Sequence, residues 1–295
     1  MRYTQLRAFD AVAREGGFAL AAERIGLTQP ALTIQVRALE DAYAVKLFRR
    51  GGGKATLTGP GRDLFQLTSE LFAVEGRIKD YLSASKELKT GEIRLSIDGP
   101  HLAMGLIAAF RERYPGVQMA VSSGNAHEVW RDLMEGRADV VIVANPPKDQ
   151  RAEVMAIHRC ALQVLVGIDH PWAKRSALSI SDLVAQPAIL REPQSNTRRT
   201  LERILDDTNT RLDVMLELGG REAILEAVAA GLGIGFVFER EVTGNTRVKS
   251  IPLKGATHDN LDTVAALKSH RARRVVQAFF EIAKEWRDLN GGVSD

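Results

Sequence analysis

One face of a short predicted helix carries side chains suited to contacting the edges of DNA bases. The residues on this face are Gln29, Pro30, Thr33, Ile34 and Arg37. Gln can pair with adenine in a bidentate way, Thr offers a hydroxyl and a methyl group, Ile can contact a thymine methyl group, and Arg can reach guanine or a phosphate. A helix face that is merely solvated has a similar composition, so this helix alone does not decide between the two interpretations.

The surrounding pattern makes this helix the second one of a helix-turn-helix. Behind the polar face, an apolar stripe recurs at helical spacing and comprises Leu32, Val36, Leu39 and Tyr43. Thr28 can cap the helix, and Pro30 lies in the first turn, where a missing N–H costs nothing. An alanine-rich helix at 18–25 precedes it and ends at Gly26. Two helices joined by a tight glycine turn are typical of this motif.

A glycine-rich loop after this helix predicts a wing. Residues 51–53 are all glycine, and Arg50 and Lys54 flank them between two short extended segments. Basic residues on a wing commonly follow the phosphates and the minor groove. We therefore predict that Arg50 and Lys54 contact DNA, together with Thr28 and the polar face of the helix.

Composition and charge narrow the class of protein. The 295 residues are 45% apolar and 26% charged, as in ordinary globular proteins. Residues 1–62 have a net charge of +5 and the remainder has −2, within a total of +3. A basic head on a slightly acidic body indicates that only the head meets a polyanion such as nucleic acid.

The same sequence indicates a cytoplasmic protein. The single cysteine, Cys160, excludes an internal disulfide, which fits a reducing compartment. The first residues carry charges where a signal peptide needs an apolar run. No segment approaches the ~18 consecutive apolar residues of a membrane span, so we expect no membrane partner.

From Pro60 the pattern changes to one long helix. A stripe that is apolar except at Ser85 follows alternating three- and four-residue steps and comprises Leu64, Leu67, Leu71, Val74, Ile78, Tyr81, Ser85 and Leu88. This period predicts pairing with a second helix over residues 60–89, and a dimer would present two recognition helices to two half-sites. The alternative is that this helix packs on its own domain.

After Gly91 the chain alternates strands with helices. Strands are predicted near residues 92–98, 117–122, 138–144, 163–168, 188–190, 214–218, 234–238 and 263–267, and helices at 101–114, 126–136, 196–207, 221–230 and 272–289. This alternation predicts an α/β sheet covered on both faces, within a chain that is α+β overall. Open α/β sheets bind ligands at the carboxyl ends of their strands. The length of this part allows two lobes with a cleft between them.

The segment from Arg191 to Arg198 joins a predicted strand to a predicted helix. Free backbone N–H groups, the hydroxyls of Ser195 and Thr197 and the positive helix end converge there, which is typical of an anion pocket. The competing interpretation is that Ser195 or Asn196 merely caps the helix, and the local sequence favours that interpretation.

The sequence contains no recognisable motif for catalysis, a cofactor or a metal ion. The run from Gly231 to Gly235 follows a helix and precedes a strand, which is the reverse of a dinucleotide fingerprint, so we interpret Gly231 as a helix end. The six histidines are scattered without metal-ligand spacing, and Cys160 has no partner cysteine. We therefore expect no enzyme activity, no cofactor and no metal ion.

Taken together, the sequence resembles the LysR-type transcriptional regulators over essentially the whole chain. The matching positions in the head are 6–9, 18, 21–24, 28–33, 35–36, 39–40, 47–50, 57–58 and 61, and those in the body are 91, 110, 114–117, 136–140, 170–171 and 229–235. The resemblance implies a winged helix-turn-helix, a linker helix that forms a dimerisation coiled coil, and a two-lobed α/β effector-binding domain resembling periplasmic binding proteins. We assign these to residues 1–58, 59–90 and 91–295, with lobe I at about 91–162 and 266–295 and lobe II at about 163–265.

The resemblance also implies partners and effector residues. The partners are double-stranded DNA at a promoter or operator, a small anionic effector, further copies of the chain in a dimer and tetramer, and RNA polymerase. In this family the strand-to-helix loop lines the effector cleft, which favours the anion pocket over the simple cap. The implied effector residues are Asp98, Gly99, Pro100, His101, Asn125, Asn145, Ser195, Asn196, Thr197 and Arg198. The chain departs from the family at Ile34, where a polar or basic residue is frequent, and in its glycine-rich wing.

A finer resemblance is to the LysR regulators associated with aminoethylphosphonate catabolism, through residues 190–193, 221–223 and 226–231. A zwitterionic phosphonate would place its anionic group near Ser195, Thr197 and Arg198 and its amine near Asp98. The alternative function is a cytoplasmic solute-binding protein or a small-molecule enzyme built on the α/β body.

Overall fold

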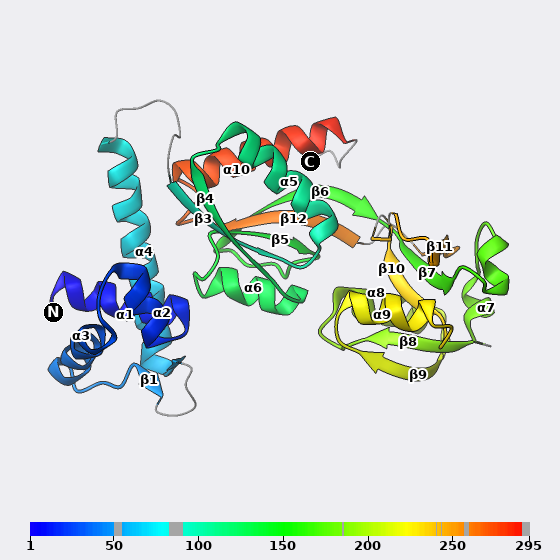
Figure 1. The fold of residues 1–295 in the computed structure, drawn as a ribbon, viewed down its shortest axis with the longest axis horizontal. Helices are drawn as coiled ribbons and strands as arrows, with labels where there is room; N and C mark the ends of the chain where they lie inside the picture. Colours follow the sequence, from blue (N-terminus) through cyan, green and yellow to red (C-terminus); the bar gives the residue numbers. More distant parts are fainter. Residues whose placement is uncertain are drawn as a thin grey trace.

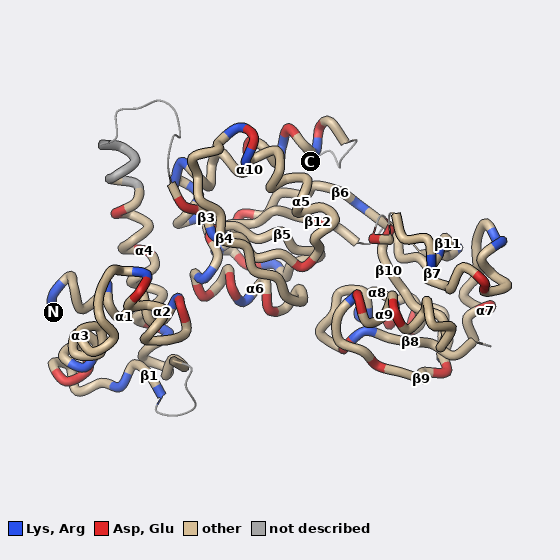
Figure 2. The backbone as a smooth tube through the Cα atoms, in the orientation of Figure 1, with Lys and Arg blue, Asp and Glu red and all other residues tan. Residues whose placement is uncertain are grey.

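A computed structural model describes residues 1–49, 55–82, 91–184, 186–239, 241–242, 244–256 and 260–290, without the side chains of residues 77 and 79–82. Figure 1 shows the N-terminal helices and the long helix α4 on the left, one lobe in the middle and a second lobe on the right. Acidic and basic residues are interspersed along both lobes (Figure 2). The helical head, the long helix and the two α/β lobes confirm the predicted fold class.

The head is built from three helices around one apolar core. These are α1 (Tyr3–Glu15), α2 (Phe18–Ile25) and α3 (Gln29–Ala42). Gly16 and Gly26 end α1 and α2 in the left-handed conformation, at φ 65° and 72°, which a residue with a Cβ adopts at a cost. The Thr28 hydroxyl accepts a hydrogen bond from the Ala31 N–H at 3.4 Å, as predicted for an N-cap.

The buried stripe of α3 ends earlier than predicted. Leu32, Val36 and Leu39 are buried, whereas Tyr43 is 57% exposed. The prediction for Tyr43 was wrong because the helix ends at Ala42 and Tyr43 follows in a non-helical conformation. The buried polar residue Glu40 lies beside the stripe instead.

The wing is an antiparallel pair of two short strands, β1 (Phe48–Arg49) and β2 (Thr56–Leu57). Arg50, the glycines at 51–53 and Lys54 lie outside the described residues.

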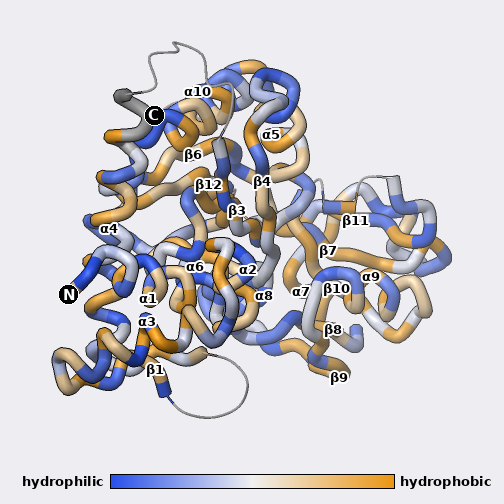
Figure 3. Tube along the Cα trace, turned by 60° about the vertical axis from the view of Figure 1, so that its left-hand side comes forward, coloured by the Kyte–Doolittle hydropathy of each residue, from blue (hydrophilic) through white to orange (hydrophobic). Residues whose placement is uncertain are grey.

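Helix α4 (Gly59–Leu82) packs on the head at its start and leaves an apolar stripe exposed further along. Phe65 is buried in the core of the head, and Leu64 and Phe72 pack against that core. The exposed apolar residues are Leu67, Leu71, Val74 and Ile78. Hydrophobic and hydrophilic positions alternate along this helix in Figure 3. The part of the predicted linker at residues 83–90, including Leu88, lies outside the described residues.

The first lobe has a five-stranded sheet in the order β4-β3-β5-β12-β6. Its strands are β3 (Gly91–Ile97), β4 (Val117–Ser123), β5 (Val140–Ala144), β6 (Ala152–Cys160) and β12 (Asn260–Leu267). Strands β3, β4 and β5 are parallel, while β12 is antiparallel to both β5 and β6. Helices α5 (Pro100–Arg113) and α10 (Arg274–Leu289) share one core with the sheet, and α6 (Ala126–Met134) belongs to a second core.

The second lobe combines a three-stranded antiparallel sheet with a parallel pair of strands. The sheet order is β10-β7-β11, made of β7 (Leu162–Gly167), β10 (Gly235–Phe238) and β11 (Val248–Pro252). The pair is β8 (Pro187–Arg191) and β9 (Asp213–Leu218), which the bridge between Ala188 and Ile234 connects to β10. The helices are η1 (Pro171–Lys174), α7 (Ile180–Leu183), α8 (Asn196–Asp207) and α9 (Arg221–Ala229).

The predicted strands are all present, but two observed strands were missed. Strands β6 and β11 lie at the edges of their sheets, where exposed side chains make the sequence less apolar. The residues 260–265, assigned to lobe II from the sequence, lie in β12 of the first lobe's sheet. Within the part of the chain that the structure describes, every helix is too short or too polar to span a membrane.

Candidate functional site

The face of α3 predicted to meet DNA is on the surface. Gln29, Pro30, Ile34 and Arg37 are exposed, and Ile34 is exposed to 64% although it is apolar. Thr33 is half-buried, and its hydroxyl donates to the Gln29 carbonyl at 2.8 Å. The structure therefore brings the described DNA candidates together on one face, with Thr28 at its start. Arg50 and Lys54 lie outside the described residues.

Glu40 fixes the end of α3 to the start of the wing. Its carboxylate accepts hydrogen bonds from the backbone N–H groups of Leu47 at 2.8 Å and Phe48 at 3.3 Å, and from Lys46 Nζ at 3.1 Å. Burial raises the pKa of Glu40, but these N–H donors and the Lys46 charge outweigh it and lower the pKa below its usual value. Glu40 thus positions the helix relative to the wing, a role that the sequence did not reveal.

A second candidate site is a narrow cavity between the two lobes. Its lining residues are Asp98, Gly99, His101, Asn125, Ala126, Ala144, Arg191, Ser195, Asn196, Thr197, Arg221, Phe238, Glu241, Asn260 and Asp262. Its volume of about 30 Å³ is room for one or two water molecules. A larger molecule does not fit this space as the lining residues stand.

The structure brings most of the predicted effector residues together in this cavity. Pro100 instead lines a neighbouring cavity that His101 also reaches. Asn125 caps α6 by accepting a hydrogen bond from the Glu128 N–H at 3.0 Å, so its side-chain oxygen is already engaged. Arg198 is not among the lining residues, and its guanidinium pairs with Glu202 at 2.5 Å.

Helix α8 begins at this cavity with an open N-terminus. Ser195 is the N-cap residue, yet its side chain makes no capping hydrogen bond. Ser195 and Thr197 are both buried. The first N–H groups of a helix have no partner within it. Ser195 thus occupies the N-cap position, as one alternative predicted, but its side chain does not cap the helix, and a helix end of this kind is chemically able to accept an anion.

Two arginines that were not among the predicted effector residues also line the cavity. Arg191 pairs with Glu192 at 2.8 Å, and Arg221 pairs with Glu241 at 2.5 Å. The Nε of Arg221 is buried and has no hydrogen-bond acceptor among the described residues. Arg221 follows a glycine pair at the start of α9, the same kind of strand-to-helix junction that singled out Ser195.

Acidic groups share the cavity with these arginines. Burial raises the pKa of Asp98 to about 6, although the Ala144 N–H and the Arg221 charge favour the ionised form. Burial and the charge of Asp98 raise the pKa of Asp262 to about 7. The cavity is therefore suited to a ligand that carries both an anionic group and a hydrogen-bond donor or cation.

Three asparagines connect the lobes beside the cavity. Asn145 Nδ2 donates to Asn196 Oδ1 at 3.2 Å, and its Oδ1 accepts from the Leu261 N–H at 2.9 Å. Asn196 Nδ2 also donates to Asn260 Oδ1 at 2.5 Å. Asn145 has φ 47°, in the left-handed region that Asn tolerates better than most residues. These amides join β5 and β12 of one lobe to α8 of the other.

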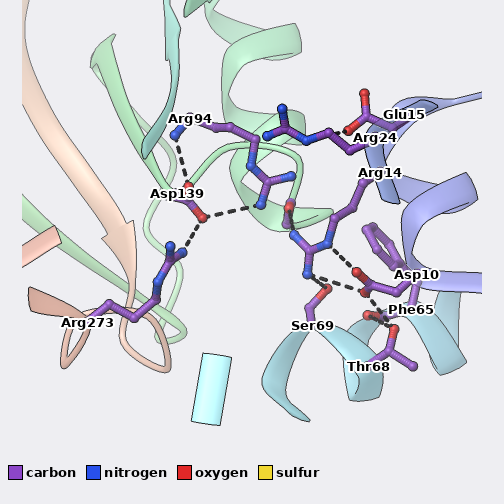
Figure 4. Close-up of polar contacts among 11 residues, drawn as sticks. Asp10, Arg14, Glu15, Arg24, Phe65, Thr68, Ser69, Arg94, Asp139 and Arg273 are labelled. Carbon is purple, nitrogen blue, oxygen red and sulfur yellow. Dashed lines mark hydrogen bonds and ion pairs between the residues drawn. The ribbon is translucent and has the colours of Figure 1, made fainter. Parts of the chain in front are cut away.

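The head contacts the first lobe through a polar cluster (Figure 4). Arg14 of α1 donates to the Gly136 carbonyl and to Ser69 Oγ of α4, and it pairs with the buried Asp10 at 2.5 Å. Arg24 of α2 also forms an ion pair with Glu92 of β3. These contacts join the helical head to the first lobe within one chain.

Close to this contact, Asp139 is buried between two arginines. Arg273 Nη1 lies 2.5 Å from its carboxylate, and the Arg94 N–H donates to it at 2.9 Å. Burial raises the pKa of Asp139, but the charges of Arg94 and Arg273 outweigh it and hold the pKa well below its usual range.

Comparison with known proteins gives matches over nearly the whole chain. The model of the bacterial regulatory helix-turn-helix protein, lysR family, matches residues 3–62, and the LysR substrate binding domain matches residues 86–288. The HTH-type transcriptional regulator CbbR of Rhizobium meliloti (strain 1021) is 35% identical over 240 residues, which cover 80% of this chain and 76% of CbbR.

Solved structures share the fold. A full-length OxyR variant from Pseudomonas aeruginosa superposes with a TM-score of 0.81 at 19% identity, covering 100% of this chain and 98% of OxyR. The regulatory domain of Synechocystis PCC6803 CcmR in complex with 2-PG has a TM-score of 0.62 at 23% identity, covering 66% of this chain and 97% of that domain.

Proposed function

The chain belongs to the LysR family of DNA-binding transcriptional regulators, and we propose that a small anionic effector bound between its two lobes controls how it engages its operator. Its relatives are regulators rather than enzymes, so the alternative of an enzyme built on the α/β body has no support from them.

The open N-terminus of α8 is the observation that carries the effector proposal. Ser195 leaves the first turn without a side-chain cap while it lies buried in the cavity. Arg221 reaches the same cavity and keeps one buried N–H without an acceptor among the described residues. An anionic group placed between them would receive charge-assisted hydrogen bonds from both.

Asp98 favours an effector that is zwitterionic. Its Oδ2 is held by the Ala144 N–H at 2.8 Å, on the first-lobe side of the cavity. An aminoalkylphosphonate would bridge the two lobes, with its amine at Asp98 and its phosphonate group at the start of α8. The CcmR domain, which shares this fold, was solved with the small ligand 2-PG.

Effector binding would change the angle between the lobes. The cavity is too narrow for such a molecule, so the lobes would have to separate around it, and separation would break the Asn145–Asn196 hydrogen bond between them. A ligand that prefers one lobe arrangement shifts the population toward it. The contact of Arg14 with Gly136 joins the first lobe to the head, which gives this shift a route to the DNA-binding face.

Calorimetry with the full chain tests the proposal. The ligands are 2-aminoethylphosphonate, ethylphosphonate without the amine, short amino acids, inorganic phosphate and sulfate. We expect saturable binding of at least one anion, weakened by Ser195→Ala and by Arg221→Met roughly tenfold or more, since a hydrogen bond to a charged group contributes about 1.5–3 kcal/mol. Asp98→Asn should weaken only ligands with an amine.

Two further variants sharpen the result. Arg175→Ala removes an arginine that pairs with Asp182 far from the cavity and is the matched control. Arg198→Met tests the predicted role of Arg198 against its observed pairing with Glu202. If no anion binds, or if Ser195→Ala and Arg221→Met bind as the unchanged protein does, the effector proposal is wrong.

A further inference from the structure

Three side chains with metal-binding donor atoms meet on two neighbouring strands of the first lobe. His158 and Cys160 lie two residues apart on β6, so they share one face of the sheet. Asp262 of β12 is the register partner of His158. One donor atom from each residue lies within 4.8 Å of the donor atoms of the other two.

The chemistry of this donor set selects a particular class of ion. An imidazole nitrogen, a thiolate sulfur and a carboxylate oxygen are the ligands that Zn²⁺ takes in proteins, at about 2.0–2.3 Å. Hard ions such as Mg²⁺ and Ca²⁺ prefer oxygen ligands alone. The Cys160 sulfur already lies 3.9 Å from an Asp262 oxygen, so an ion between them needs only a small approach of the side chains.

A neighbouring amide orients two of the three donors. Asn260 Nδ2 donates to Cys160 Sγ at 3.0 Å and to Asp262 Oδ1 at 2.9 Å. Such hydrogen bonds from a residue that does not itself bind the ion fix the orientation of metal ligands and tune their affinity.

A neighbouring cavity gives an ion a route to this cluster, and acidic side chains in its lining attract a cation. A cavity of about 790 Å³ reaches His158 and Asp262, and Glu239 and Glu241 also line it. Glu241 is engaged by Arg221 and by the Phe238 N–H, so the fourth ligand position falls to water from this cavity.

From this arrangement we propose that His158, Cys160 and Asp262 bind a divalent transition-metal ion of the Zn²⁺ type, with water as the fourth ligand. Cys160 ends β6 just before the chain crosses to β7 of the second lobe, and Asn260, which starts β12, contacts the Asn145–Asn196 pair. The ion would therefore link β6 to β12 and stabilise these strands where the two lobes meet. The cluster shares Asp262 with the lining of the effector cavity, but the proposal rests on the three donor atoms and requires no effector.

Titration of the full chain with Co²⁺ tests the site, after dialysis against a chelator. We expect one equivalent of Co²⁺ to bind, with a thiolate-to-cobalt charge-transfer band and the visible bands of tetrahedral Co²⁺, and Zn²⁺ to displace it. Cys160→Ser should abolish the charge-transfer band, and His158→Gln and Asp262→Asn should each weaken Co²⁺ binding at least about tenfold. Zn²⁺ should also raise the Tm of the unchanged protein and not that of the variants.

The matched control is His127→Gln, which removes an exposed histidine from α6. It should leave the spectrum and the affinity unchanged. His158 is half-buried, so His158→Gln provides a folded variant even if the change at the buried Cys160 prevents folding. Absence of the charge-transfer band, or a band and affinity that survive both His158→Gln and Asp262→Asn, would overturn the proposal.

Discussion

Arg14 of α1 donates a hydrogen bond to the main-chain carbonyl of Gly136, 122 residues further along the chain. Gly136 ends the turn after α6 with φ 66°, and a Cβ at this position would lie 2.9 Å from Ser69 Oγ of α4. Ser69 in turn accepts a hydrogen bond from Arg14 at 3.2 Å. The contact between head and first lobe therefore depends on a glycine for two separate reasons, its conformation and its lack of a side chain.

Gly136→Ala should weaken the contact between the head and the first lobe. The methyl group would meet Ser69, and the left-handed conformation adds roughly 1–2 kcal/mol of strain. We expect faster hydrogen exchange in α1 and in the first half of α4, together with a larger radius of gyration in X-ray scattering.

The matched control is Gly231→Ala. Gly231 follows α9 with φ 76°, and a Cβ there would have nothing within 4 Å. This variant should show the strain alone, as a lower free energy of unfolding without a change in the head. Equal exchange rates in α1 for both variants would contradict the role of Gly136 in the contact.

The recognition helix gives a second prediction. Gln29 is exposed on the α3 face, where its side chain is predicted to make a bidentate contact with a base. Gln29→Ala should remove this contact and so reduce the difference in binding free energy between the operator and a mutated operator by roughly 1–3 kcal/mol. Arg37→Ala should weaken binding to all sequences if Arg37 contacts phosphate, and should reduce the salt slope by about 0.9. Fluorescence anisotropy at several salt concentrations measures both, with Arg175→Ala as the control. A uniform loss for Gln29→Ala would exclude direct base recognition by that residue.

Much of helix α3 was predictable because the causes of its structure are local. The stripe of Leu32, Val36 and Leu39 and the cap at Thr28 follow from helical spacing and turn chemistry within a few residues. Tyr43 was misplaced because the stripe pattern does not show where the helix ends.

The cavity between the lobes was predictable only in part. The strand-to-helix junction at Ser195 can be recognised in the sequence, and candidate residues of the other lobe could be named one by one. The convergence of Arg221 with that junction joins the starts of two helices, and that of His158 and Cys160 with Asp262 joins two strands far apart in the chain. The spacing of residues along the sequence does not show which distant segments pair in the fold. For this reason the histidines showed no metal-ligand spacing in the sequence.

The exposed stripe on α4 gives a third prediction. Leu67, Leu71, Val74 and Ile78 are between 42% and 63% exposed, a series of apolar surface residues at coiled-coil spacing. Leu71→Lys should place a charge in the seam of the predicted dimer and shift sedimentation equilibrium toward the monomer. Glu70→Lys also introduces a lysine, at the adjacent exposed position outside the apolar stripe, and should leave the dimer intact. A Leu71→Lys protein that remains dimeric would mean that another surface forms the dimer.

The buried His270 gives a prediction about stability and pH. Burial lowers the pKa of His270 to about 4, although the charge of Asp139 opposes this. In the unfolded chain the imidazole has its usual pKa of about 6.5, so between pH 6.5 and 4 the unfolded state binds the proton and the native state does not. The contribution of His270 to the free energy of unfolding should therefore fall by about 3 kcal/mol as the pH falls through this window.

Comparison of variants isolates this effect. Burial raises the pKa of Asp98 to about 6 and, with the charge of Asp98, that of Asp262 to about 7, and these groups act in the opposite direction over the same pH range. His270→Gln removes only the histidine contribution, so its free energy of unfolding relative to the unchanged protein should rise steadily from pH 7 to pH 4. His127→Gln, at an exposed position, should show a constant difference. Chemical denaturation at several pH values measures both, and parallel curves for the two variants would show that His270 is protonated in the native state as readily as in the unfolded one.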